Sequence, residues 1–149
     1  MTPMYFEDLA VGQVYRSPEM TVEAEGIKSF AEQFDPQPFH LDENAAAGSF
    51  FGGLVASGWY TAAITMRLLV TGDLKIAGGL IGAGVEEIRW PRPVRPGDVL
   101  HVDCEIVEIR VSKSHPERGV VKSRITTTDQ EGRPVQQMIV NMIVPRRPE

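Results

Sequence analysis

The sequence contains a single cysteine, Cys104, so the chain cannot form an internal disulfide or a metal site built on several thiolates. The neighbouring residues, "VDCEIVEI", alternate as in a strand, which predicts a buried structural thiol. The first residues, "MTPMYFEDLAVGQ", lack the basic and then apolar segments of a signal peptide. No apolar run approaches the ~20 residues that a membrane-spanning helix needs. These absences predict a cytoplasmic protein without a membrane segment.

An excess of positive charge is also missing. The net charge is −5 and the pI is near 5.2, so nucleic acid and anionic membranes are not expected as partners. The sequence has no GxGxxG or GxxxxGK[ST] motif for phosphates and no HExxH motif for zinc, and "VASGW" is not a GxSxG elbow. A chain of 149 residues can bury an adequate core without a metal or a disulfide. We therefore expect one domain over residues 1–149.

The first half of the chain shows mainly helical periodicity. Residues 12–22 are expected to form a first strand, and a helix follows that Pro36 ends, since the residue before a proline avoids helical dihedral angles. The apolar stripe of this helix consists of Ile27, Phe30, Ala31 and Phe34. "LDENAAAGS" predicts a short helix with Asp42 as its N-cap and Gly48 at its end.

A longer helix is predicted from Trp59 to Val70, where nearly every residue is apolar or small. A helix that is apolar all round is a buried helix. From Leu80 onward, four segments have strand character and are joined by the turn-like links "PRPVRPGD", "SKSHPER" and "QEGR". Short links predict an antiparallel meander. The expected fold class is therefore α+β, with an antiparallel sheet wrapped around a long central helix.

One of the three histidines, His40, follows Asp35 by five positions, with two prolines between them. Histidine titrates near neutral pH and works well beside a carboxylate, so the two residues are candidates for acid–base catalysis. The prolines restrict the loop and favour a fixed geometry. An ordinary turn, with Asp35 ending a helix and His40 capping or packing, is the alternative. His101 and His115 are expected to be structural or solvated.

Gly58 stands at the start of the predicted central helix, where backbone N–H groups have no intrahelical acceptor. The positive end of the helix macrodipole lies there, and glycine lets a ligand approach closely. Such a site suits a developing oxyanion, for example the enolate of a thioester. The alternative is that Ser57 merely caps the helix. A triad of Ser57, His40 and Asp35 can also be written, although the spacing does not favour it.

The order of these elements resembles the MaoC-like dehydratases, the (R)-specific enoyl-CoA hydratase group of the hot-dog fold. The likeness rests on "FDPQPFHLDE", "FGGLVASGW", the central helix and "WPRPVRPGDVL" with the strands that follow. It covers roughly Phe6 to Val144. The Asp-x4-His element is its specific part, and "RPVRPGDVL" is a secondary marker.

The resemblance implies an enzyme, a hydro-lyase of fatty acid metabolism acting on acyl-CoA. Asp35 and His40 would hold one water, which adds to the β-carbon of a trans-2-enoyl thioester to give the (3R)-hydroxyacyl thioester; dehydration is the reverse reaction. The thioester oxygen would accept a hydrogen bond from the Gly58 N–H. The resemblance also implies a homodimer with the acyl pocket at its interface, and no metal, flavin or nicotinamide cofactor.

Three residues depart from the pattern usual in the family, namely Gln37, Ser57 and Met66. The resemblance implies that Met66 either weakens the positioning of the water or leaves that role to Thr65 or Ser57. Aromatic residues flank the expected site and either line the acyl pocket or pack in the core: Phe39, Phe50, Phe51 and Trp59. Arginines near "RWPRPVRPGD" either meet CoA phosphates or form a solvated turn: Arg89, Arg92 and Arg95.

Two other functions stay open. One is an acyl-CoA thioesterase on the same fold, which would release free thiol. The other is a non-catalytic acyl-thioester-binding domain, which would bind its ligand without turnover. Because one fold hosts many functions, the hydratase hypothesis depends on Asp35, His40 and Gly58 together.

Overall fold

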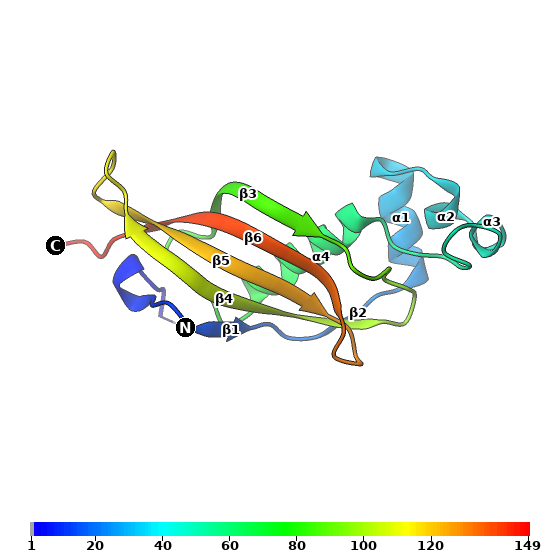
Figure 1. The fold of residues 1–149 in the computed structure, drawn as a ribbon, viewed down its shortest axis with the longest axis horizontal. Coiled ribbons are helices and arrows are strands. Elements are labelled where there is room, and N and C mark those ends of the chain that lie inside the picture. The colour runs from blue at the N-terminus through cyan, green and yellow to red at the C-terminus, as the bar shows by residue number, and fades with distance from the viewer. Residues whose placement is uncertain (1) are drawn as a thin grey trace.

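The computed structural model describes residues 2–149, in which an antiparallel sheet lies along the central helix α4 (Gly58–Thr71) (Figure 1). The strand order is β1-β4-β5-β6-β3, and β2 pairs with β4 as a sixth strand. The strands are β1 (Val14–Arg16), β2 (Met20–Thr21), β3 (Ile81–Arg89), β4 (Val99–Val111), β5 (Arg118–Thr128) and β6 (Pro134–Pro145). The remaining helices are η1 (Phe6–Asp8), α1 (Ala24–Phe34), α2 (Pro38–Leu41) and α3 (Glu43–Ala47). The expected α+β architecture is confirmed.

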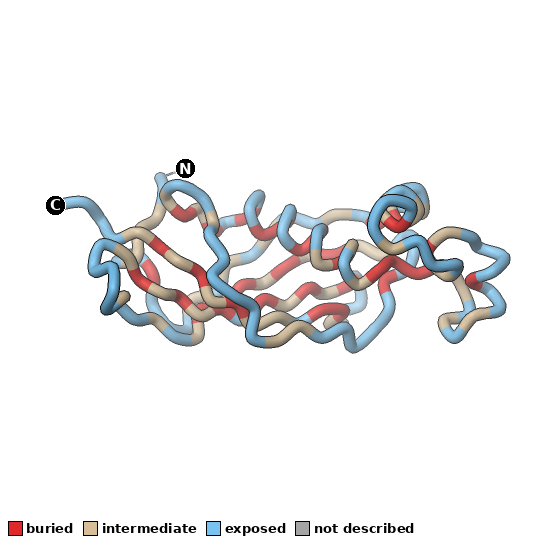
Figure 2. Tube along the Cα trace, turned by 90° about the horizontal axis from the view of Figure 1, so that it is seen from above, coloured by how far each residue is buried: buried red, intermediate tan, exposed pale blue. Residues whose placement is uncertain are grey.

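The core forms between the inner face of the sheet and one side of α4. Buried and partly exposed residues alternate along β4 and β5, so every second side chain joins the core (Figure 2). Leu100, Val102 and Ile106 of β4 belong to the same buried cluster as Ile64 and Leu68 of α4. No helix among residues 2–149 is long and apolar enough to cross a membrane.

Cys104 lies on β4 in this core with no exposed surface, as predicted. Burial raises the pKa of its thiol to about 11. The side chain therefore stays protonated and inert in the folded protein, since the thiolate is the reactive form.

The central helix is not buried all round, which corrects the expectation from its sequence. An exposed stripe runs along the side of α4 that the sheet does not cover, made of Trp59, Ala63, Met66 and Val70. Strand β3, at one end of the strand order, also exposes Ile81 and Val85. One sheet can cover only one side of a helix, so a single chain leaves an apolar stripe open.

Two predictions of strand arrangement were wrong in part. β4, β5 and β6 form the expected meander, but β3 pairs with β6 instead of β4. The first strand is split into β1 and β2. Between them, the N–H of Val102 bonds to the hydroxyl of Ser17 and Pro18 has no N–H to donate, so the ladder is interrupted.

The predicted helices before the central one are confirmed. α1 ends at Phe34, before Pro36, and α3 begins after Asp42, whose carboxylate accepts hydrogen bonds from the N–H groups of Asn44 and Ala45. The segment expected as a loop between Asp35 and His40 contains the short helix α2. Pro38 is its first residue, where the missing N–H costs nothing and the fixed φ angle suits the helix.

The β5–β6 hairpin is held by the buried carboxylate of Asp129, which is 3% exposed. It accepts hydrogen bonds from the backbone N–H groups of Glu131 and Arg133 and from the guanidinium of Arg133. Burial raises the pKa of Asp129, but these hydrogen bonds and the Arg133 charge outweigh it, so the pKa lies below its ordinary value.

Replacing Asp129 by alanine is expected to lower the free energy of unfolding by about 1–3 kcal/mol at neutral pH, because two partly buried N–H groups and the guanidinium of Arg133 lose their acceptor. A depressed pKa means that the stabilisation is complete above the ordinary aspartate pKa of 3.8 and is lost as the pH falls below it. Urea unfolding at several pH values measures both. Glu131→Ala, which removes an exposed partner of Arg133, is the control and should change stability little. Equal losses from both substitutions would contradict the role of Asp129.

Candidate active site

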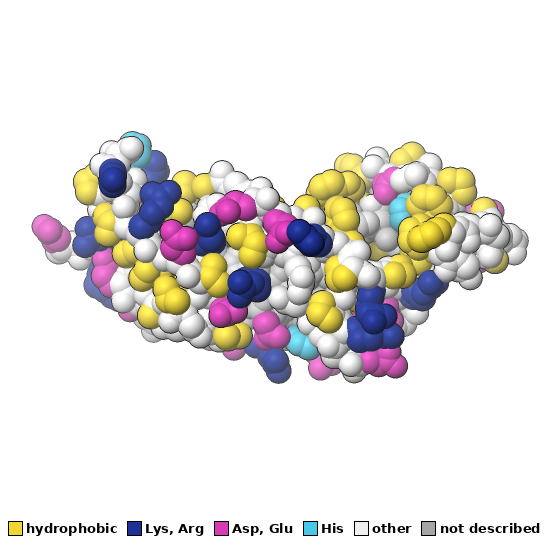
Figure 3. Space-filling view, viewed as in Figure 1, with side chains coloured by type: hydrophobic (Ala, Val, Ile, Leu, Met, Phe, Trp, Pro, Cys, Tyr) yellow, Lys and Arg dark blue, Asp and Glu magenta, His cyan; other side chains and the backbone are white. Residues whose placement is uncertain are grey.

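A cavity of about 450 Å³ lies between the N-terminal end of α4, the segment around α2 and residues 90–94. The six residues expected to act in catalysis or to bind the substrate all line it: Asp35, Phe39, His40, Ser57, Gly58 and Trp59. Figure 3 shows hydrophobic side chains gathered over the α1–α3 end of the molecule, beside a hollow between these helices and the sheet. The polar candidates thus share one largely apolar recess.

His40 is buried at 5% exposure, and its ring nitrogen Nδ1 makes a hydrogen bond to the backbone. Nδ1 lies 2.7 Å from the carbonyl oxygen of Val55, and because a carbonyl can only accept, Nδ1 carries the proton. Phe39 packs its edge against the imidazole at 4.6 Å between ring centroids, and its own carbonyl accepts from the Val55 N–H. The ring is therefore fixed in tautomer and orientation.

Nε2 of His40 faces Oδ2 of Asp35 at 3.3 Å. Asp35 follows the last residue of α1, and its other oxygen, Oδ1, accepts a hydrogen bond of 2.6 Å from the amide of Gln37. With Nδ1 already protonated, Nε2 of a neutral His40 and the Asp35 carboxylate are both acceptors. A water with two O–H donors satisfies both, which is the arrangement needed to activate that water.

Burial raises the pKa of Asp35, but the hydroxyl of Ser57, the amide of Gln37 and the positive charge that His40 carries when it is protonated together lower it below the ordinary value. Asp35 is thus a carboxylate at neutral pH. Gln37, which was identified from the sequence as a departure, donates one of the hydrogen bonds to this carboxylate.

The start of α4 leaves one backbone donor free. Tyr60 and Thr61 donate their N–H groups to the carbonyl of Ser57, and Trp59 donates its N–H to the Ser57 hydroxyl. Among the described residues, no acceptor meets the N–H of Gly58. Ser57 is therefore a helix cap, as one hypothesis held, but its capping leaves the Gly58 N–H available to a ligand oxygen.

The structure adds wall residues that sequence reasoning did not select, chiefly Trp90, Thr61 and Val94. The signal for Trp90 was its place beside the proline-rich link, in which only the arginines were considered as candidate ligand-binding residues. A Cβ atom on Gly58 would lie 2.6 Å from Cε2 of Trp90, so the indole lies directly against the start of α4.

Other sequence candidates fall into two groups. Phe50, Phe51 and Arg92 line the cavity as considered. Met66 lies on the exposed stripe of α4, while Thr65 is buried, and neither lines the cavity. The other two arginines are engaged elsewhere: Arg89 pairs with Glu87 and Arg95 donates to the Phe51 carbonyl.

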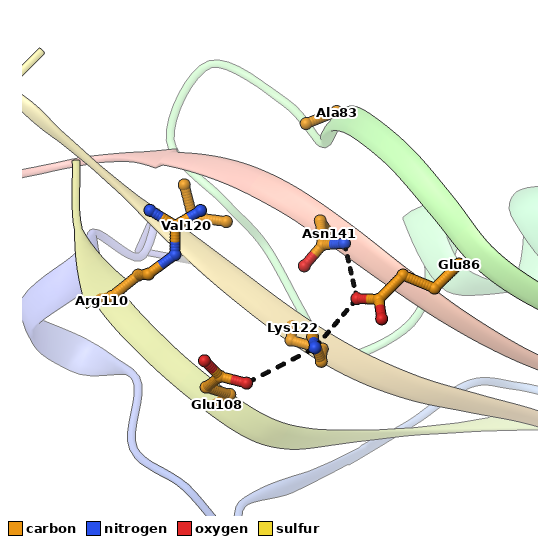
Figure 4. A pocket seen from close by; sticks show the side chains of 7 residues that line it. All are labelled: Ala83, Glu86, Glu108, Arg110, Val120, Lys122 and Asn141. Carbon is orange, nitrogen blue, oxygen red and sulfur yellow. Dashed lines mark hydrogen bonds and ion pairs between the residues drawn. The ribbon is translucent and has the colours of Figure 1, made fainter. Parts of the chain in front are cut away.

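A second cavity, of about 370 Å³, lies on the outer face of the sheet. Lys122 reaches across it to Glu86 and Glu108, at 3.0 and 3.5 Å, and Asn141 donates to Glu86 (Figure 4). These charges satisfy one another and include no histidine. Residues 2–149 contain no group of three or more potential ligands placed to hold a metal ion. The chemistry thus points to the recess of Asp35 and His40.

The sequence profile of the MaoC like domain matches residues 7–129. The crystal structure of a MaoC-like dehydratase from Rhodospirillum rubrum is 55% identical, with a TM-score of 0.94 over 98% of this chain and 99% of that one. An unliganded R-hydratase from Pseudomonas aeruginosa is 27% identical, with a TM-score of 0.76 over 97% and 88% of the two chains. A 3-hydroxybutyryl-CoA dehydratase of Methylorubrum extorquens is 33% identical over 111 residues, 71% of this chain and 66% of that one. These likenesses confirm the hot-dog fold.

Proposed function

The chain belongs to the family of MaoC-like dehydratases, and from that premise we propose that it catalyses the reversible hydration of a trans-2-enoyl-CoA to the (3R)-hydroxyacyl-CoA. The observation that carries the proposal is the pairing of His40 Nε2 with Asp35 at 3.3 Å in one recess with the free N–H of Gly58. The hydratase and dehydratase relatives support the same reaction class.

In the proposed mechanism, Asp35 and His40 hold a water by accepting its two hydrogens. The water oxygen bonds to the β-carbon of the substrate as one proton passes to the Asp35–His40 pair. The electrons of the carbon–carbon double bond move toward the thioester carbonyl, whose oxygen becomes an enolate and accepts a hydrogen bond from Gly58. The proton then passes to the α-carbon, so water has added across the double bond. Dehydration follows these steps in reverse.

The decisive experiment is turnover of short and medium trans-2-enoyl-CoAs, followed by loss of the conjugated thioester absorbance. Free thiol is monitored in the same samples. Loss of conjugation without thiol release establishes the hydratase. Thiol release identifies a thioesterase instead, and binding of CoA thioesters without any reaction identifies a non-catalytic binding domain.

We also propose that two copies of the chain pair through β3 and the exposed stripe of α4. β3 ends the strand order, and no strand within residues 2–149 pairs with its outer edge; natural proteins usually cover such an edge. Beside it lies an apolar cavity of about 310 Å³, lined among others by Met66 and Val85, which are 50% and 55% exposed. A second copy would cover both features at once.

Replacing Val85 by arginine is expected to convert the dimer into a monomer, because the charge would have to be buried at the pairing edge. Sedimentation velocity over a range of protein concentrations measures the change. Val111→Arg is the matched control, since Val111 is 41% exposed at the far end of β4, and this substitution should leave the association state unaltered. A monomeric parent protein, or two variants that behave alike, would contradict this assembly.

A further inference from the structure

A network of hydrogen-bonded polar groups leads from the wall of the candidate active site into the core. The indole N–H of Trp90 donates to Oε1 of Gln136 at 2.8 Å, and Nε2 of Gln136 donates to the hydroxyl of Thr65 at 3.0 Å. The Thr65 hydroxyl lies 2.6 Å from that of Thr127 and 2.9 Å from the carbonyl oxygen of Thr61. Gln136, Thr65 and Thr127 are at most 1% exposed.

The direction of every hydrogen bond in this network is determined by the groups at its two ends, the Trp90 indole and the Thr61 carbonyl. Trp90 can only donate, so Gln136 must turn its oxygen to the indole and its NH₂ group to Thr65. The Thr61 carbonyl can only accept, so the Thr65 proton goes there and Thr127 donates to Thr65. Each member has a partner, and a fully satisfied buried network is rigid.

This rigidity matters because of where Trp90 lies. Its ring rests against Gly58, forms one wall of the cavity, and meets Trp59 edge to face at 5.3 Å between ring centroids. Trp90 itself is 40% exposed, so apolar contact alone does not fix its position. Gln136, on β6, is the group that ties the ring to the core.

We propose that Gln136 is a positioning residue for the active site: it fixes the indole of Trp90 against Gly58, and the indole limits the size of the acyl group accepted beside the thioester. The limit on the acyl group rests on the proposed hydratase function. The anchoring of Trp90 does not, so the two parts are tested separately.

The anchoring is tested by fluorescence. The chain has two tryptophans, so a Trp59→Phe background leaves Trp90 as the only tryptophan, which is excited selectively over the tyrosines at long wavelength. Adding Gln136→Leu is expected to shift the emission to longer wavelength and increase quenching by acrylamide, because the indole loses its partner and moves into water. Gln137→Leu is the matched control: the same substitution one position along, on an exposed side chain, should change neither.

Gln136→Leu should fold, since the hydrogen bonds between Thr127 and Thr65 and from Thr65 to the Thr61 carbonyl remain. Circular dichroism and thermal unfolding check this. A second variant, Trp90→Phe, removes the indole donor and leaves Gln136 in place, and it is used in the kinetic measurements below. Unchanged emission and quenching in a folded Gln136→Leu protein would overturn the anchoring.

The limit on the acyl group is tested by kinetics in the otherwise native sequence. Gln136→Leu is expected to raise the KM for crotonyl-CoA about tenfold and to change kcat by less than about threefold, since Asp35 and His40 stay in place. The ratio of kcat/KM for trans-2-octenoyl-CoA to that for crotonyl-CoA should rise about tenfold. Gln137→Leu should reproduce the parent values.

A double-mutant cycle shows whether Gln136 acts through Trp90. In a Trp90→Phe background, Gln136→Leu should have almost no further effect on KM or on chain-length preference. Additive effects, or a loss confined to kcat, would overturn the positioning role. If no substrate turns over, the hydratase proposal fails, and the affinity for butyryl-CoA is measured instead, by quenching of Trp90 emission in the Trp59→Phe background. A weaker affinity in Gln136→Leu still supports the positioning role. An equal affinity overturns it.

Discussion

Replacing His40 by alanine is expected to lower the kcat for hydration of crotonyl-CoA by about 10²–10⁴-fold, the usual contribution of a positioned acid or base. In this variant, the water bound by Nε2 and the Asp35 carboxylate loses one of its two acceptors. The pair that transfers the water's proton to the α-carbon is then incomplete. Asp35→Asn should cause a loss of the same order, because an amide cannot take the proton. Absorbance at saturating crotonyl-CoA measures both variants.

The chain offers a matched control for this result. His101 also faces a carboxylate, with Nε2 3.4 Å from Oδ2 of Asp103, but it does not line the cavity. His101→Ala should therefore keep nearly all of the parent kcat. Because His40→Ala leaves the buried Val55 carbonyl without its donor, its thermal unfolding is compared with that of the parent. A folded His40→Ala protein with parental turnover would eliminate His40 from the mechanism.

Replacing Gly58 by proline is expected to lower kcat about 10²–10³-fold relative to Gly58→Ala, the cost of losing one oxyanion donor. Both variants add a Cβ atom that displaces Trp90, so the comparison cancels that effect. Only the proline also removes the N–H. The helix itself should tolerate the change, because proline is favoured at a first helical position and the extended Ser57 backbone is compatible with a following proline.

The kcat values of the two Gly58 variants, measured on crotonyl-CoA, give the result. Matching thermal unfolding curves establish that α4 and its surroundings are equally intact in both. Equal turnover would mean that the Gly58 N–H takes no part in the reaction, and that the thioester oxygen is stabilised elsewhere. A lower kcat for the proline variant, with KM little changed, is the signature of a contact made mainly in the transition state.

Local sequence signals were sufficient for the features that depend on neighbouring residues. The caps Asp42 and Ser57 marked the starts of α3 and α4, because a side-chain oxygen there replaces the missing backbone acceptor. Pro36 marked the end of α1 for a different local reason, since the residue before a proline avoids helical dihedral angles. Asp35 and His40 are close in sequence, so their meeting in one recess followed from a short, restrained connection.

Features that depend on distant residues were not predictable in the same way. Trp90 and Gln136 are 46 positions apart, and no local pattern indicates that they meet. The placement of β3 beside β6 is likewise a choice between partners with similar alternation. The apolar residues of α4 indicated burial correctly on one side only, because composition does not distinguish a surface covered by the same chain from one left open.

The buried thiol of Cys104 is a natural probe of unfolding, because its reaction with a thiol reagent reports exposure of the core. With its pKa raised to about 11 and no exposed surface, it should not react with a thiol reagent until the sheet opens. The rate of labelling therefore measures how often the core of β4 becomes exposed, with no probe to be engineered. A thiol-reactive dye added to the native protein would therefore react only with coenzyme A released by a reaction, so a thioesterase would be detected against a low background.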